Sequence, residues 1–101
     1  MIIYHIDLPE AWAEFTADLY HAPSLNTEGF IHCSFAEQLD GVVERYYSKA
    51  DKIIVLAIET DRLMSRVVNE PSTNREIYPH IYGPINRDAI VASNERIVAG
   101  Q

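Results

Sequence analysis

Five residues of this chain have side chains suited to recognising a small molecule: His5, His32, Glu70, His80 and Tyr82. Imidazoles hydrogen-bond ribose hydroxyls and phosphates, and a tyrosine ring stacks on a flat ring. A carboxylate hydrogen-bonds a ribose hydroxyl and stabilises a developing oxocarbenium ion. All five fall at expected strand ends or in a constrained loop, where binding residues concentrate. The sequence therefore predicts a small-ligand pocket lined by His5, His32, His80 and Tyr82, with nucleotides among the ligands that would suit it.

Two other chemistries are less well supported by the spacing of these residues. The histidines, Cys33 and Glu70 show no metal-binding spacing such as Cys-x-x-Cys, so no metal site is predicted. A helix N-terminus would lower the pKa of the Cys33 thiol, but the adjacent His32 points to the opposite face of a strand and is badly placed as its base. A lone cysteine is more often a small buried hydrophobe, and His5 equally fits a hydrogen-bonded core histidine.

The segment from Gly29 to Ser34 is expected to position the central histidine. Phe30 and Ile31 indicate a short strand, and Ser34 with Glu37 forms a capping-box pattern at the start of a helix. The following apolar residues recur at helical spacing and predict one broad buried face: Phe35, Leu39, Val42, Val43, Tyr46 and Tyr47. The two tyrosine hydroxyls can reach a pocket from there, although packing at the core edge is the simpler interpretation.

The remaining pattern predicts an α+β fold with two main helices. Strands are expected at 2–6, 52–59 and 66–70, with 52–59 central because it is apolar on both faces. The other expected elements are a first helix opened by Asp7 and continuing to Leu19, a loop over 20–28, a proline-stiffened edge segment over 77–85, and closing strands at 89–92 and 96–98 joined by a bend.

Length, charge and cysteine content narrow the class of protein. The 101 residues suit one domain spanning 1–101, and one cysteine allows no internal disulfide, as in a reducing cytoplasm. No signal peptide is visible, and the longest apolar run, 53–58, is far shorter than the ~20 residues of a membrane span. The net charge is −7 and the eight basic residues are scattered, which argues against a broad nucleic-acid surface but leaves room for a pocket that binds one phosphorylated molecule. The sequence says nothing about protein partners.

Three sequence motifs, spread along most of the chain, resemble those of a known family. Ile3-Tyr4-His5-Ile6, Glu28-Gly29-Phe30-Ile31-His32-Cys33-Ser34, and Glu70 followed by Tyr78-Pro79-His80-Ile81-Tyr82-Gly83-Pro84 resemble the small bacterial family catalogued as domain of unknown function 952. That family is grouped by structure with the ADP-ribosyltransferases and RNA 2′-phosphotransferases, which bind NAD or an ADP-ribosylated intermediate between two small sheets. The resemblance implies an ADP-ribosyltransferase-like split β-sheet.

The same resemblance implies roles for individual residues. His5 matches a first-strand histidine that holds a ribose, His32 falls in the cleft, and Glu70 stands where a transferase carboxylate stands. Ile6-Asp7 replaces the Gly-Thr that usually follows the first histidine.

Three functions remain open from the sequence. The first is a cytoplasmic small-ligand pocket. The second is an enzyme that transfers an ADP-ribosyl or 2′-phosphate group and uses NAD as a substrate, with Glu70 and His32 as catalytic residues. The third is a protein-interaction module that presents exposed tyrosines.

Overall fold

The computed structural model describes residues 1–98, the side chain of Thr73 excepted. Its first sheet has three antiparallel strands in the order β1-β4-β8. The strands are β1 (Ile2–Asp7), β4 (Lys52–Glu59) and β8 (Ile90–Ile97). The predicted central position of β4 is confirmed: its side chains enter a larger core on one face and a smaller core on the other. Such burial on both faces explains the unbroken apolar run.

Strand β8 corrects the prediction of two closing strands joined by a bend. It runs unbroken and pairs with β4 as far as Lys52, with one register shift between Ala57 and Ile58. Its middle residues, Ser93, Asn94 and Glu95, are exposed. Polar residues suit this strand because it lies at the sheet edge with side chains in solvent, and they need no turn to accommodate them.

A second three-stranded antiparallel sheet has the order β3-β6-β5, with strands β3 (Ile31–His32), β6 (Ile77–Tyr82) and β5 (Arg66–Pro71). The expected edge segment over 77–85 is wrong, since β6 is the central strand and Pro79 is fully buried in it. The Pro79 carbonyl accepts from the Cys33 amide (3.2 Å), so the side of Pro79 that lacks an N–H faces β3. The ladder with β3 ends at His32, and the missing donor therefore interrupts little.

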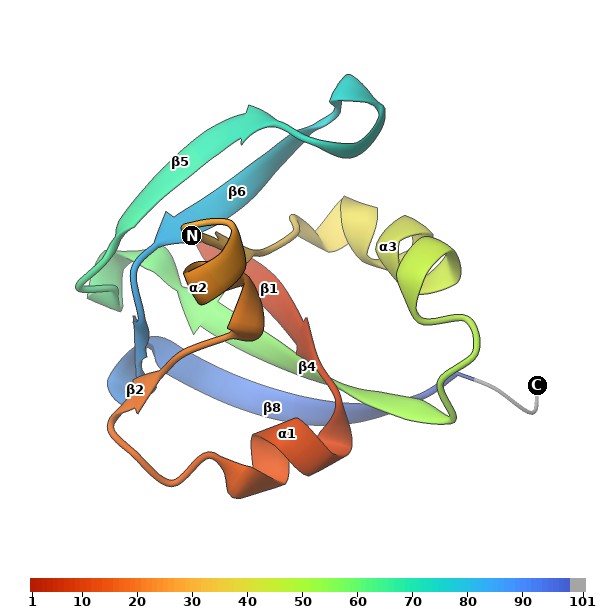
Figure 1. Ribbon diagram of the computed structural model, residues 1–101, viewed down its shortest axis with the longest axis horizontal. Helices are drawn as coiled ribbons and strands as arrows, with labels where there is room; N and C mark the ends of the chain where they lie inside the picture. Colours follow the sequence, from red (N-terminus) through yellow and green to blue (C-terminus); the bar gives the residue numbers. More distant parts are fainter. Residues whose placement is uncertain (99–101) are drawn as a thin grey trace.

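The two sheets meet at one isolated bridge between Tyr4 and Ser34. The Tyr4 amide donates to the Ser34 carbonyl (2.9 Å), and the Ser34 amide donates to the Tyr4 carbonyl (2.7 Å). In Figure 1 the β5–β6 hairpin lies in the upper part of the view and β4 with β8 in the lower part. The segment that carries His32 and Ser34 thus connects the two sheets.

The first predicted helix is much shorter than expected. Helix α1 (Pro9–Glu14) begins after Leu8, and Asp7 belongs to β1 and does not cap the helix. Phe15 ends the helix, and Leu19 lies in β2 (Leu19–Tyr20), which pairs with β7 (Ile85–Asn86). The expected loop over 20–28 contains a second short helix, α2 (Pro23–Thr27).

The second predicted helix is confirmed in position and corrected at its start. A 3-10 turn (Ala36–Gln38) leads into α3 (Leu39–Tyr46), so residues 1–98 form three short α-helices where two main helices were expected. Ser34 does not cap this segment; the Phe35 amide donates to the Gln38 side-chain oxygen (2.9 Å). Gln38 also donates to the Ile77 carbonyl (2.7 Å) and so ties this helix to β6.

Three further 3-10 turns, Thr60–Arg62, Thr73–Arg75 and Arg87–Ala89, complete an α+β fold of several small antiparallel sheets and few short helices. In the described part of the chain, no helix is long and apolar enough to cross a membrane.

Candidate functional site

Register places three ring side chains together on one face of the β3-β6-β5 sheet. His32 lies directly opposite His80, and their rings meet edge to face with centroids 5.3 Å apart. Phe30 precedes His32 by two residues and stacks on His80 at 4.1 Å with an interplanar angle of 17°. These contacts bury His80 to 2% exposure. Two of the predicted histidines, His32 and His80, are therefore brought into contact.

Glu70 receives two hydrogen bonds on this face. The Tyr82 hydroxyl donates to Glu70 Oε1, and the same oxygen lies 2.8 Å from Nδ1 of His80. The bonds from Tyr82 and His80 lower the pKa of the Glu70 carboxyl, which is ionised at neutral pH. Because a carboxylate only accepts, Nδ1 of His80 carries the proton. Nε2 of His80 is buried and has no partner among the described residues.

His5 acts on the backbone of His32, and its ring does not contact the other predicted site residues. Its Nδ1 lies 2.7 Å from the His32 carbonyl oxygen, which only accepts, so Nδ1 donates. Burial lowers the pKa of His5, which favours the neutral ring. Beside it, the Tyr20 hydroxyl donates to Asp7 (2.6 Å) and lies 3.5 Å from Nε2 of His5. His5 therefore holds β3 against β1 from within the core.

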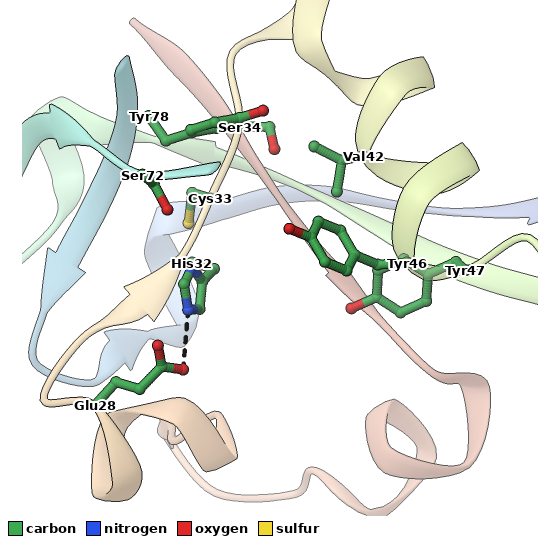
Figure 2. Close-up of a pocket in the computed structure, with 9 residues that line it drawn as sticks. All are labelled: Glu28, His32, Cys33, Ser34, Val42, Tyr46, Tyr47, Ser72 and Tyr78. Carbon is green, nitrogen blue, oxygen red and sulfur yellow. Dashed lines mark hydrogen bonds and ion pairs between the residues drawn. The ribbon is translucent and has the colours of Figure 1, made fainter. Parts of the chain in front are cut away.

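The main cavity of the described structure lies between α3 and the strand that carries His32. Its volume is about 550 Å³. Figure 2 shows α3 contributing one wall and the 32–34 segment the other. The lining groups are mostly hydroxyls and rings, with one imidazole, one carboxylate, one thiol and one aliphatic side chain: Glu28, His32, Cys33, Ser34, Val42, Tyr46, Tyr47, Ser72 and Tyr78.

Of the predicted site residues, His32 alone lines this cavity. Its Nε2 lies 3.0 Å from Glu28 Oε2, and both side chains are about half exposed, at 47% and 49%. This contact sits at the lower end of the cavity in Figure 2, whereas Ser34 and Tyr78 lie at the upper end. His5, Glu70, His80 and Tyr82 lie outside the lining. The residues of the predicted pocket are thus divided between a cavity, which His32 lines, and a polar cluster of Glu70, His80 and Tyr82 outside the cavity lining.

Sequence reasoning missed most of the cavity wall. Tyr78 lies two residues before His80 in β6, and the two side chains therefore share one face of the strand. Strand periodicity could have predicted this. Tyr46 and Tyr47, predicted as core-edge residues with a pocket as the other option, line the cavity. Glu28 and Ser72 carry no local signal, because their place depends on how separate segments pack.

Cys33 lines the cavity but is not suited to nucleophilic attack. The residue is 4% exposed, and burial raises the pKa of its thiol far above the ordinary value. The thiol is therefore protonated at neutral pH. Among residues 1–98, no group of three or more histidine, cysteine or acidic side chains is arranged to hold a metal ion.

Comparison with known proteins relates this architecture to solved structures and to one family. The crystal structure of protein CC0527 from Caulobacter crescentus is 23% identical, with a TM-score of 0.80 over 94% of this chain and 85% of that chain. A double mutant of CC0527 gives the same TM-score and coverage at 22% identity. At these identities the likeness concerns the fold. Comparison with curated proteins gives no match.

A family model matches residues 6–93, which include β3, β6 and all nine cavity-lining residues. The match covers far more than half of the chain. This protein therefore belongs to the family described as Protein of unknown function (DUF952).

Proposed function

We propose that the cavity between α3 and the 32–34 segment binds a small polar molecule with a flat ring, of the nucleoside or nucleotide class. The observation that carries this proposal is the lining: three tyrosine rings together with one imidazole and two serine hydroxyls around about 550 Å³. Small-molecule sites usually enclose about 300–1,000 Å³ and combine aromatic walls with a few polar groups. The cavity has the size and the chemistry for one such ligand.

The two walls offer different interactions. Tyr46, the last residue of α3, and Tyr47, which caps the helix, offer rings for stacking against a base. Across from them, His32 offers hydrogen bonds to ribose hydroxyls, and Ser34 adds a hydroxyl at the other end of this wall. Glu28, 3.0 Å from His32 Nε2, orients that imidazole. A ligand that stacks on one wall and hydrogen-bonds to the other would use both.

Ligand-observed NMR tests the proposal with NAD, ADP-ribose, AMP and a 2′-phosphorylated nucleotide. We expect at least one to bind the wild type and to lose affinity in His32→Ala. The matched control is His21→Ala, since His21 is exposed and lies outside the cavity lining. Binding that survives His32→Ala, or silence across the whole panel, would overturn the proposal, and silence would favour the protein-interaction module.

A second candidate function is transfer of an ADP-ribosyl or 2′-phosphate group with NAD as substrate, on an ADP-ribosyltransferase-like split sheet. Two observations favour it: the two three-stranded sheets join at Tyr4 and Ser34 beside the cavity, and Glu70 is held as a carboxylate by His80, whose ring meets that of His32. In this reaction Glu70 stabilises the ribosyl transition state, and His5 positions the ribose site through the His32 backbone.

Glu70→Gln separates transfer from binding. The amide oxygen still accepts a hydrogen bond, but the charge is gone, so we expect nicotinamide release to collapse while NAD binding survives. A wild-type protein that binds NAD without releasing nicotinamide under any condition would refute the transferase and leave the binding function standing.

A further inference from the structure

A cation lies at the edge of the cavity although it is not part of the lining. Arg45 of α3 extends toward β6, and its Nη2 donates to the Tyr78 hydroxyl at 2.6 Å. Its guanidinium carbon lies 5.8 Å from the centre of the Tyr46 ring. Tyr78 and Tyr46 both line the cavity, and the guanidinium therefore lies between two wall residues.

Gly41 provides room for this placement. It lies one helical turn before Arg45, and a Cβ at position 41 would come within 3.3 Å of Arg45 Nη1. A glycine inside a helix costs about 1 kcal/mol relative to alanine. An alanine at this position would require the flexible end of Arg45 to shift by a few tenths of an ångström, so the glycine leaves room for the arginine along the helix.

Arg45 keeps donors for a further partner. In residues 1–98, Arg45 has no carboxylate within ion-pair distance, in contrast to Arg96, which has Asp40 at 2.7 Å, and Lys52, which has Glu95 at 3.3 Å. A guanidinium carries five N–H donors, and the bond to Tyr78 uses one of them.

The two ends of the cavity carry different charged groups, although the Tyr78 hydroxyl that accepts from Arg45 also lies 3.4 Å from Glu76 Oε1. Glu28 lies at the lower end in Figure 2, next to His32, whereas Tyr78, which contacts Arg45, lies at the upper end with Ser34. The anionic group of a ligand would be drawn toward the Arg45 guanidinium and away from Glu28. Guanidinium binds phosphate through parallel hydrogen bonds, which gives direction as well as affinity.

We propose that Arg45 is the anion-recognising residue of this cavity, and that the ligand is a phosphorylated nucleoside whose phosphate lies at the Tyr78 end. This inference rests on the proposed function and specifies its ligand class. Ser34 at the same end offers a hydroxyl to the phosphate oxygens, and the nucleoside extends toward His32.

Titration calorimetry with AMP, adenosine and inorganic phosphate tests the inference. In the wild type we expect AMP to bind about tenfold or more tightly than adenosine, because a charge-assisted hydrogen bond is gained. Arg45→Gln keeps a donor for Tyr78 but removes the charge, and should bring AMP affinity down to that of adenosine. Lys49→Gln, which makes the same change in net charge on an exposed residue, should leave the tenfold preference intact.

The outcomes separate the two proposals. Equal binding of AMP and adenosine by the wild type, or a preference that survives Arg45→Gln, overturns the role of Arg45 and leaves the nucleoside pocket standing. Binding of neither compound overturns the role of Arg45, and silence across the NMR panel as well overturns the nucleoside pocket. Arg45→Lys keeps the charge without the planar fork and should retain part of the preference, which shows that a loss in Arg45→Gln does not arise from misfolding.

Discussion

The buried imidazole of His5 should make folding stability depend on pH in a window of its own. Burial lowers the pKa of His5 in the folded protein, while in the unfolded chain it returns to about 6.5. Below about pH 6.5, His5 binds a proton in the unfolded state but stays neutral in the folded state. The contribution is therefore fully present above about pH 6.5 and is lost as pH falls toward the folded-state pKa.

The magnitude follows from linkage. One group that stays neutral when folded and titrates at about 6.5 when unfolded changes the unfolding free energy by up to about 1.2 kcal/mol between pH 7.0 and 5.5. The groups that face His5 are Asp7, Tyr20 and His32. The lowered pKa of Glu70 acts near and below pH 4.5, and the raised pKa values of Tyr20 and Cys33 act above about pH 8, outside this window.

Urea unfolding at pH 7.0, 6.5, 6.0 and 5.5 measures the effect. The informative variant is His5→Asn, whose amide nitrogen takes the place of Nδ1 and still donates to the His32 carbonyl but does not titrate. We expect its stability to be about 1 kcal/mol less sensitive to pH than that of the wild type across the range. His21→Asn, at an exposed histidine, should keep the wild-type slope. An undiminished slope in His5→Asn would refute the assignment.

Other predictions concern single side chains. Cys33 should react with a thiol reagent such as Ellman's reagent only after denaturation, because it is buried and its pKa is raised; rapid labelling of native protein would contradict this. Gly83→Ala should destabilise the protein by about 1–3 kcal/mol in urea unfolding, because φ is +153° and a Cβ would collide with Ser65; an unchanged midpoint would be inconsistent with that geometry. Ile81→Ala should cost about 2–5 kcal/mol in the same assay, since Ile81 is 0% exposed; a loss under 1 kcal/mol would show that the core closes around it.

Local pattern predicted those elements whose stability is local or follows from simple burial. The apolar run 53–58 predicted the central strand β4, and helical spacing predicted α3. The first helix failed because a distant residue competes with it. Arg87 donates to the carbonyls of Phe15 and Ala17 (both 3.2 Å) and covers the Phe15 ring, which holds that segment out of a helix. The spacing of apolar residues within one segment cannot predict a contact with a residue so distant in the sequence.

The candidate site shows the same division. Its residue types and motifs predicted a polar site at His32, and register then placed His80 opposite it. The separation of the cavity from the cluster of Glu70, His80 and Tyr82 could not be predicted. It depends on which residues of β6 pack against Phe30 and on which end of β6 lies near α3. The sequence predicts Arg45 only as a scattered basic residue on the outer face of its helix, because its contact with Tyr78 depends on how α3 packs against β6.

His32 is where these features converge, and the nature of its contacts makes its substitution informative. His5 holds the His32 carbonyl, and the neighbouring Cys33 amide binds Pro79; neither bond involves the His32 side chain. The imidazole itself contacts Glu28 at 3.0 Å, half exposed, and the edge of His80. Truncation to alanine therefore leaves the backbone of β3 anchored on both sides while it removes the imidazole from the cavity wall. A loss of ligand affinity in that variant would report on recognition by the side chain, because the strand that carries it stays in place.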